Sequence, residues 1–478
     1  MMVKLICTEM ERFAGGLLVL ALVLSPMIVV QAALPSDNVS VQWNVLLNKL
    51  FCTSSGLVHD PIIILANLNL AQWHGLLALK GTGACTKPEA VVAYASRKVL
   101  ANYFVFDQNT LIDPLLANQL TALGLSETEK KLAKGLGEAV ARRLISKSDP
   151  AYEFALPELR SAINANQAHP TPGLLRFLSN DTVFGPNALF VTHAIAFDSP
   201  YVIPYPNRFI EEYLGDLKPM AVPSDAWDKQ YNLLKDVGRI NWSGRTYEMN
   251  YTASLYLCPR QNTTYCLFIE SFWTVAAMNI LPKETSLDDI VEVFAKLSVA
   301  LHDALVVVAA QKDGYWFWRP QMAFTAGDPR HPPIPDWLPY GRVIFTGEYP
   351  SGTTMSYAAA ATVLQDYFGK KKVPFTVDGG GVFGGATCYL AGTPVKPRHF
   401  DSLWAAVEEA KRGRMYVGAH YKFSVDDGAE AGKRVAQYIL KHWGDRPPQG
   451  VLPDTEYLKV HANLPKKSGD WDPLRFEY

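Results

Sequence analysis

The feature that most constrains the fold is a set of polar side chains spread over the last third of this 478-residue chain. Two cations come first, a Pro-Ser-Gly stretch follows, and a third cation and a histidine come later. The residues are Lys312, Arg319, Ser351, Gly352, Arg414 and His420. A fold that brings them together joins three positive charges, a hydroxyl, a glycine amide and an imidazole, which suits a tetrahedral oxyanion.

The composition favours a large globular protein with a local anion site. Hydrophobic residues make up 49% of the chain and charged residues 19%, which is typical of a folded protein with a sizeable core. The net charge of −1 gives no basic face for nucleic acid, so we expect no nucleic-acid partner.

Residues 1–32 are predicted to be a signal peptide. Lys4 and Arg12 precede the apolar run Ala14–Val30, and Val30-Gln31-Ala32 offers small residues for cleavage. An uncleaved signal anchor is the alternative. No later run reaches the ~18 consecutive apolar residues of a membrane helix, so we expect a secreted protein without a stable membrane span after cleavage.

Glycosylation sites are consistent with secretion. The chain has five Asn-x-Ser/Thr triplets, at Asn38, Asn180, Asn241, Asn250 and Asn262. Because each triplet also arises by chance, the group carries more weight than any single one.

The cysteines predict a disulfide hairpin, because the secretory route is oxidising. Cys258 and Cys266 flank a short polar stretch and are predicted to pair. A bridge between Cys52 and Cys85, which would leave Cys388 free, is one alternative among several that the sequence leaves open.

The apolar periodicity predicts a mainly α-helical bundle with a small β-hairpin insertion. Helical patterns cover Val91–Phe104, Ser126–Ser146 and the run that starts at Ser286, whereas Tyr247–Phe272 alternates like a strand. The predicted regions are the signal peptide at 1–32, a helical and loop-rich part with the disulfide hairpin at 33–285, a helical core at 286–445 and an irregular tail at 446–478.

The first two motifs place charge at helix ends. Lys312 and Arg319 are two helical turns apart, which predicts a shared face on a helix that ends at Pro320. Ser351-Gly352-Thr353 precedes an alanine-rich helix, and the N-terminus of a helix attracts anions. The simpler alternatives are a solvated basic edge and an ordinary N-cap.

Arg414 and His420 are six positions apart and do not share a helical face, so a turn is needed to bring them together. The imidazole would serve as a nucleophile towards phosphorus or as a ligand to a metal oxyanion. The alternative is a structural histidine.

In combination, the motifs resemble the vanadium-dependent haloperoxidase and type 2 phosphatidic acid phosphatase superfamily. Its signature is Lys-x6-Arg-Pro, then Pro-Ser-Gly-His, then Ser-Arg-x5-His. Phe317-Trp-Arg-Pro320 and Glu348-Tyr-Pro-Ser-Gly352 look like the soluble haloperoxidase branch, and the likeness extends over roughly residues 70–445.

The resemblance implies a helical bundle that binds vanadate, or phosphate in its place. Lys312, Arg319 and Arg414 would neutralise the equatorial oxygens, with hydrogen bonds from Ser351 and the Gly352 amide. His420 would bind vanadium, or form the phosphohistidine of a phosphatase. The implied partners are small molecules: hydrogen peroxide, a halide, an organic acceptor or a phosphate ester. A homodimer is left open.

Three positions depart from the signature. Thr353 stands where a histidine moves protons, and a threonine hydroxyl does not titrate near neutral pH. Gly413 replaces the serine before the arginine, and Ser424 replaces an aspartate. No sequence argument places another histidine, such as His302 or His331, in the site.

The favoured function is therefore a vanadium haloperoxidase-like peroxidase that oxidises halide with hydrogen peroxide. The alternatives are an acid phosphatase that uses His420 and a catalytically impaired oxyanion-binding homologue.

Overall fold

Several helices begin at side chains that cap them. The computed structural model describes residues 37–53, 61–146, 171–175, 199–256, 269–341, 346–369, 372–377 and 397–444. Ser126 and Glu129 form a capping box at the start of the helix predicted over Ser126–Ser146, and α5 (Glu127–Ile145) follows it. The Ser286 hydroxyl accepts a hydrogen bond from the Asp289 amide and opens α12 (Leu287–Tyr315).

The predicted mainly α-helical class is confirmed. The other elements are α1 (Val39–Thr53), α2 (Pro61–Thr82), α3 (Pro88–Tyr103), η1 (Val105–Asp107), η2 (Gln108–Ile112), α4 (Asp113–Leu123), α8 (Pro206–Leu214), α9 (Asp225–Val237), α10 (Tyr247–Leu255), α11 (Ile269–Ile280), α13 (Pro320–Ala326), α14 (Gly352–Phe368), β1 (Phe375–Val377), β2 (Arg398–Phe400), α15 (Leu403–Val417) and α16 (Lys422–Lys441).

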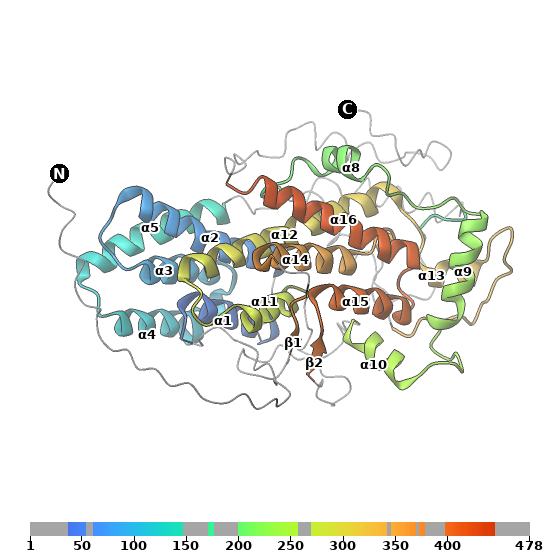
Figure 1. Cartoon of the computed structure of the whole chain (residues 1–478), viewed down its shortest axis with the longest axis horizontal. Helices are drawn as coiled ribbons and strands as arrows, with labels where there is room; N and C mark the ends of the chain where they lie inside the picture. Colours follow the sequence, from blue (N-terminus) through green and yellow to red (C-terminus); the bar gives the residue numbers. More distant parts are fainter. Residues whose placement is uncertain are drawn as a thin grey trace, which may run out of the picture. The chain divides into compact units, whose positions relative to one another are not determined.

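The core is organised around α12 and α14. The 29-residue helix α12 packs against α2, α14 and α16, and α14 also packs against α15 (Figure 1). Within the described residues, α2 and α12 are long and apolar enough to cross a membrane, but 72% and 89% of their most apolar windows are buried inside the protein. Burial against other helices accounts for their apolar character.

A buried carboxylate fastens a distant segment to α12. Asp303 interrupts the apolar run of that helix and is fully buried. Its two oxygens accept hydrogen bonds from the amides of Tyr201, Val202 and Ile203 at 2.8, 2.9 and 3.1 Å. His302 contributes a ring nitrogen 3.0 Å from the same carboxylate. Because the carboxylate has several partners, its burial is compensated.

An aromatic cluster lies beside the end of α12. Trp227 from α9 packs against Phe317, Trp318 and Tyr421, with ring centroids 6.0, 5.8 and 4.9 Å away. All four side chains are buried. The cluster therefore joins the segment that carries Arg319 to the turn that carries His420.

The strand-like prediction for Tyr247–Phe272 is wrong in both parts that the structure describes, because its last residues already belong to α11. Residues Tyr247–Leu255 form α10, because the Thr246 hydroxyl caps the Met249 amide and the helix packs against α15. Tertiary packing outweighs a short alternation of apolar residues. The two-stranded antiparallel sheet lies elsewhere, where Phe375 pairs with Phe400 and Val377 with Arg398.

Some predictions fall outside the described residues. These are the signal peptide, the tail at 446–478, the Cys258–Cys266 bridge, Cys388, and the glycosylation sites Asn180 and Asn262. Cys85 is described, and it is an exposed, unpaired thiol. The alternative bridge from Cys85 to Cys52 is therefore not present.

Candidate oxyanion site

Lys312 lies in the last turn of α12 and is buried. Its ammonium group donates hydrogen bonds to the carbonyls of Gly347 and Glu348, at 2.5 and 3.0 Å. These bonds attach the end of α12 to the segment that leads into α14. An ammonium has three N–H donors, so one remains for a further acceptor.

The spacing predicted that Arg319 shares a helix with Lys312, and this prediction is wrong. Helix α12 ends at Tyr315, and Trp316 takes a left-handed conformation with φ 48°. Arg319 is instead the N-cap of α13, with Pro320 in its first turn. The chain therefore reverses between the two cations, a change that helical spacing alone does not reveal.

The Arg319 guanidinium nevertheless reaches the same segment as Lys312. Its Nε and NH2 groups donate to the carbonyl and the hydroxyl of Thr346, both at 2.9 Å, and NH1 donates to the Ala419 carbonyl at 3.0 Å. The side chain is buried. Arg319 thus connects residue 346 to the turn before α16 and fixes the position of its own charge.

The N-terminus of α14 carries the second motif. Ser351 is the N-cap, and its Oγ accepts from the Thr354 amide at 3.5 Å. The hydroxyl hydrogen of Ser351 remains available, and the amides of Gly352 and Thr353 lack intrahelical acceptors, as at any helix start. The ordinary N-cap and the anion-binding interpretation are therefore compatible.

Arg414 lies in the last turn of α15 and donates to the Tyr256 carbonyl at 2.6 Å. Its Nε is buried and has no hydrogen-bond partner within the described residues. A buried, unused donor on a cation is costly unless an acceptor is supplied. The group is thus suited to an anion.

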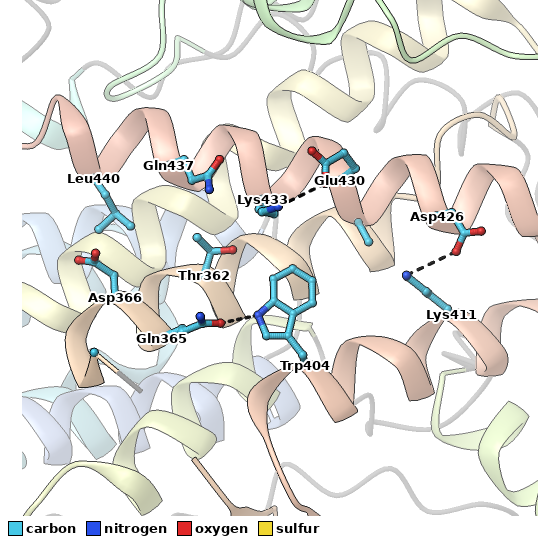
Figure 2. Close-up of a pocket in the computed structure, with 12 residues that line it drawn as sticks. Thr362, Gln365, Asp366, Trp404, Lys411, Asp426, Glu430, Lys433, Gln437 and Leu440 are labelled. Carbon is cyan, nitrogen blue, oxygen red and sulfur yellow. Dashed lines mark hydrogen bonds and ion pairs between the residues drawn. The ribbon is translucent and has the colours of Figure 1, made fainter. Parts of the chain in front are cut away.

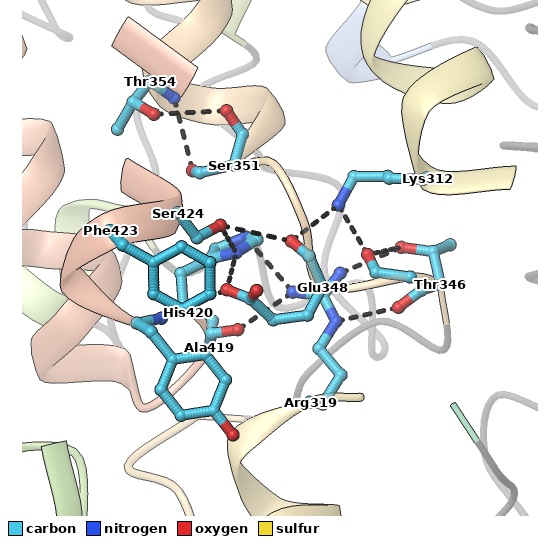
Figure 3. A network of polar contacts seen from close by, with 12 residues as sticks. Lys312, Arg319, Thr346, Glu348, Ser351, Thr354, Ala419, His420, Phe423 and Ser424 are labelled. Atoms are coloured by element: carbon cyan, nitrogen blue, oxygen red, sulfur yellow. Dashed lines mark hydrogen bonds and ion pairs between the residues drawn. The ribbon is translucent and has the colours of Figure 1, made fainter. Parts of the chain in front are cut away.

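His420 follows the turn that the sequence predicted. Gly418 ends α15 with φ 79°, and His420 precedes α16. The imidazole is buried, with Nε2 3.1 Å from NH1 of Arg319 and Nδ1 2.8 Å from Oε1 of Glu348 (Figure 3). Arg319 and His420 therefore meet despite their separation in sequence.

Glu348 is a site residue that the sequence prediction missed. Its side chain is fully buried, and Oε1 also accepts from the Tyr421 amide at 3.1 Å. Its other oxygen, Oε2, has no hydrogen-bond partner within the described residues. The glutamate is visible beside the Pro-Ser-Gly motif, but its contact with a histidine 72 positions away follows only from the fold.

The site is electrostatically crowded. Burial and then Arg319 lower the pKa of Lys312 well below its usual value, and the same two causes lower the pKa of Arg414 to about 9. Burial lowers the pKa of Arg319 to about 10 and, with Arg319 beside it, lowers that of His420 well below 6.5. Burial raises the pKa of Glu348 to about 7, against the effect of Arg319. Three cations thus face one carboxylate.

These residues fit vanadate or phosphate. The positive charges outnumber the negative one, and Arg414 has an unused buried donor. The position of Gly352 adds room, because a Cβ there would come no closer than 3.4 Å to Val308. No contact among the described residues therefore requires a glycine at this position, whereas a close approach of an anion to the helix start would favour one.

Thr353 is half-buried on the first turn of α14, and its hydroxyl makes no hydrogen bond within the described residues. Neither histidine that would replace its missing function lies in the site. His302 is bonded to Asp303, and His331 is bonded to Asp328 and stacks on Tyr231 at 3.9 Å.

A separate groove lies between α14, α15 and α16. Its volume is about 820 Å³, and its lining includes Gln365, Trp404, Lys411, Asp426 and Lys433 (Figure 2). The Trp404 indole donates to Gln365, and Lys411 pairs with Asp426 at 3.4 Å. The groove is lined by none of the predicted oxyanion residues.

The described glycosylation triplets differ in exposure. Asn241 is exposed, while Asn250 is half-buried and accepts from the Arg245 Nε at 2.7 Å. The Asn38 side chain accepts from the Val41 amide and caps α1. Asn241 is therefore the described triplet whose side chain is most open to solvent.

Comparison with known proteins identifies the helical core. Residues 292–446 match the family described as the VCPO second helical-bundle domain. No curated protein matches the sequence. Among solved structures, the chain is similar to the first bacterial vanadium-dependent iodoperoxidase, with 19% identity, a TM-score of 0.61, and coverage of 85% of this chain and 95% of that one.

Two further similar structures are bacterial vanadium-dependent chloroperoxidases. The apo form has 14% identity and a TM-score of 0.55, and the match covers 80% of this chain and 94% of that one. The holo form has 15% identity and a TM-score of 0.51, and the match covers 87% and 94%. Residues 292–446 are therefore similar to the VCPO second helical-bundle domain, and the chain shares the fold of these three vanadium-dependent enzymes.

Proposed function

We propose that this protein is a secreted peroxidase that binds vanadate, or phosphate in its place, around His420. The observation that carries the proposal is the meeting of two buried cations, Lys312 and Arg319, and the half-buried Arg414 with a histidine and a helix N-terminus. Burial, and next the charge of Arg319, lowers the pKa of each of these three groups: Lys312, Arg414 and His420. Such repulsion persists in a folded protein only where other interactions offset it, and a bound oxyanion would remove it.

The chain's own residues would hold the anion. Lys312, Arg319 and Arg414 supply charge, the Ser351 hydroxyl and the Gly352 amide supply hydrogen bonds, and His420 supplies a ring nitrogen. When bound, vanadate provides the redox chemistry by which hydrogen peroxide oxidises a halide. Because the cations are fixed by bonds to backbone carbonyls, the site is preorganised for an anion.

Proton transfer is where this chain departs from the signature. Thr353 can donate a hydrogen bond, but its hydroxyl does not exchange protons near neutral pH. The loss of a general acid typically costs about 10²–10⁴-fold in rate. Retained anion binding with slow halide oxidation is the behaviour that this site supports.

The test is a vanadate titration of the purified protein followed by two activity assays. Vanadate-dependent bromination or iodination of a phenolic dye with hydrogen peroxide supports the proposal, and His420→Ala should abolish it. His399→Ala is the matched control, because His399 is an exposed histidine on β2 whose ring contacts Thr376. The control should leave the rate unchanged.

Other outcomes would replace the proposal. Hydrolysis of a chromogenic phosphate ester, lost in His420→Ala and inhibited by vanadate, would assign the phosphatase alternative. Vanadate binding with neither activity would leave the oxyanion-binding homologue. No vanadate binding at all would reject all three.

Secretion and glycosylation belong to the same proposal. The exposed side chain of Asn241 supports a glycan at this site. Expression in a secreting eukaryotic cell should give a protein whose mass falls on removal of N-glycans, and Asn241→Gln should remove one glycan. Retention inside the cell without glycans would contradict this part.

A further inference from the structure

The hydrogen bonds at His420 determine which ring nitrogen carries the proton. An arginine only donates hydrogen bonds, so the 3.1 Å contact from NH1 of Arg319 requires a lone pair on Nε2 of His420. The neutral imidazole then carries its hydrogen on Nδ1. That N–H points to Oε1 of Glu348 at 2.8 Å.

Glu348 is itself held in place. Its Oε1 also accepts from the amide of Tyr421, the residue after His420, at 3.1 Å. Lys312 donates to the backbone carbonyl of Glu348 at 3.0 Å. The backbone of Glu348 and one of its two carboxylate oxygens are therefore held in place, and the side chain is fully buried. A rigid acceptor of this kind orients the imidazole ring as well as selecting its tautomer.

Ser424, which stands where the family signature has an aspartate, is a weak hydrogen-bond partner for His420. Ser424 Oγ lies 3.5 Å from Nδ1 of His420 and 3.5 Å from the Glu348 carbonyl. These distances are long for a hydroxyl hydrogen bond. The carboxylate beside His420 comes instead from the segment before α14 (Figure 3).

We propose that Glu348 is a positioning residue that keeps His420 in its Nδ1–H form, so that Nε2, which Arg319 contacts here, carries the lone pair that a bound oxyanion would need. Glu348 thereby replaces the carboxylate that Ser424 does not provide. This inference rests on the proposed function only for the identity of the anion, since the tautomer is a property of the protein alone. Without Glu348, the ring would be free to turn or to move its hydrogen to Nε2, towards the guanidinium.

The first experiment measures the tautomer without any anion. Nitrogen NMR of protein labelled in its histidine rings distinguishes a protonated from an unprotonated ring nitrogen, and His420→Gln identifies the His420 signals. We expect Nδ1 to be protonated and Nε2 unprotonated in the wild type. We expect the preference to be lost in Glu348→Ala. A protonated Nε2 in the wild type, or an unchanged tautomer in the variant, would overturn the proposal.

The second experiment measures vanadate affinity by calorimetry. Loss of an outer partner of a metal-binding histidine typically costs 10–100-fold in affinity, and we expect roughly this loss for Glu348→Ala. Asp427→Asn is the matched control, because Asp427 accepts from the Tyr349 hydroxyl rather than from His420. The control should bind vanadate as the wild type does.

A rescue variant separates positioning from general damage. Glu348→Ala combined with Ser424→Asp moves the carboxylate to the position in the sequence pattern and should restore the tautomer and part of the affinity. If Glu348→Ala does not fold, Glu348→Gln provides the comparison, because it keeps the shape and removes the charge. Unchanged affinity in both Glu348 variants would overturn the proposal. Failure of the wild type to bind vanadate would instead reject the proposed function, with the tautomer result still standing.

Discussion

The ring of Tyr256 lies directly over the backbone of Gly413. A Cβ at position 413 would be 2.3 Å from Cδ2 of that ring, far inside van der Waals contact. The Tyr256 carbonyl also accepts a hydrogen bond from Arg414 at 2.6 Å. Tyr256 therefore packs on Gly413 and is hydrogen-bonded to the residue that follows it. The departure from serine at this position therefore follows from the packing of Tyr256.

Gly413→Ser should destabilise the protein. The added side chain displaces the Tyr256 ring, and overpacking of this kind typically costs about 1–3 kcal/mol. Denaturant unfolding measures the change. Gly135→Ser is the control, because a Cβ at that exposed helical position meets no atom within 4 Å. Equal stability of the two variants would show that Tyr256 moves away without cost.

Oxyanion affinity should fall as the pH rises through the alkaline range. Burial and Arg319 lower the pKa of Lys312 in the anion-free protein, and a bound anion raises it again. The contribution of Lys312 is therefore fully present below its anion-free pKa and is lost above its anion-bound pKa. Calorimetry with phosphate across pH measures it. Lys312→Arg should move the loss to higher pH, because the unperturbed pKa of an arginine is higher than that of a lysine.

Thr353→His should increase turnover more than binding. The variant places a titratable group on the first turn of α14, and general acid–base catalysis typically contributes about 10²–10⁴-fold. The rate constants for halide oxidation and for ester hydrolysis are compared with vanadate affinity measured on the same samples. No gain in either rate would mean that position 353 is not the proton-transfer position.

At the scale of elements, two glycines let α16 approach α14. A Cβ at Gly432 would be 1.9 Å from the Met355 carbonyl, and one at Gly428 would be 2.6 Å from the Ser351 carbonyl. The Ser351 amide donates to the Ser424 carbonyl at 3.1 Å. This close crossing holds the N-terminus of α14 beside the first turn of α16, which follows His420.

Gly432→Ala should separate the two helices and weaken the site. A methyl group at that position meets backbone atoms that cannot move independently, so we expect a loss of at least about 1–3 kcal/mol in stability and weaker vanadate binding. Thermal unfolding and calorimetry measure the two effects. Gly81→Ala, where a Cβ meets nothing within 4 Å, should leave both unchanged.

The sequence predicts helices better than it predicts how they meet. The helical patterns that begin at Ser126 and Ser286 predicted α5 and α12, because apolar periodicity and capping both depend on residues a few positions apart. The strand predicted over Tyr247–Leu255 is a helix, because packing against α15 overrides the local alternation of apolar residues. Local chemistry is therefore readable from sequence, and tertiary preference is not.

The candidate site shows the same division. The motif spacing selected the three cations and His420, which the fold brings together. It did not show that Arg319 belongs to a new helix, or that Glu348 bonds to His420. Both depend on contacts between distant segments, for which a single sequence contains no direct signal.

At the scale of the whole molecule, vanadate should stabilise the fold. A ligand that binds only the folded state adds RT ln(1 + [L]/Kd), about 2.7 kcal/mol at a hundredfold excess over Kd. Thermal unfolding with increasing vanadate should show a rising midpoint, and phosphate should compete. His420→Ala should shift much less. An equal shift in that variant would place the bound anion elsewhere.

The like charges of the site also bear on how the chain folds. Lys312 and Arg319 are neighbours in sequence, but Arg414 comes from α15 and approaches them only when that helix docks onto α14. Their repulsion would then oppose docking late in folding, when most of the apolar surface is already buried. A counter-anion present during refolding would screen that repulsion and speed the last step. The ionic composition of the compartment where the chain folds would thus influence its yield, apart from any catalytic role.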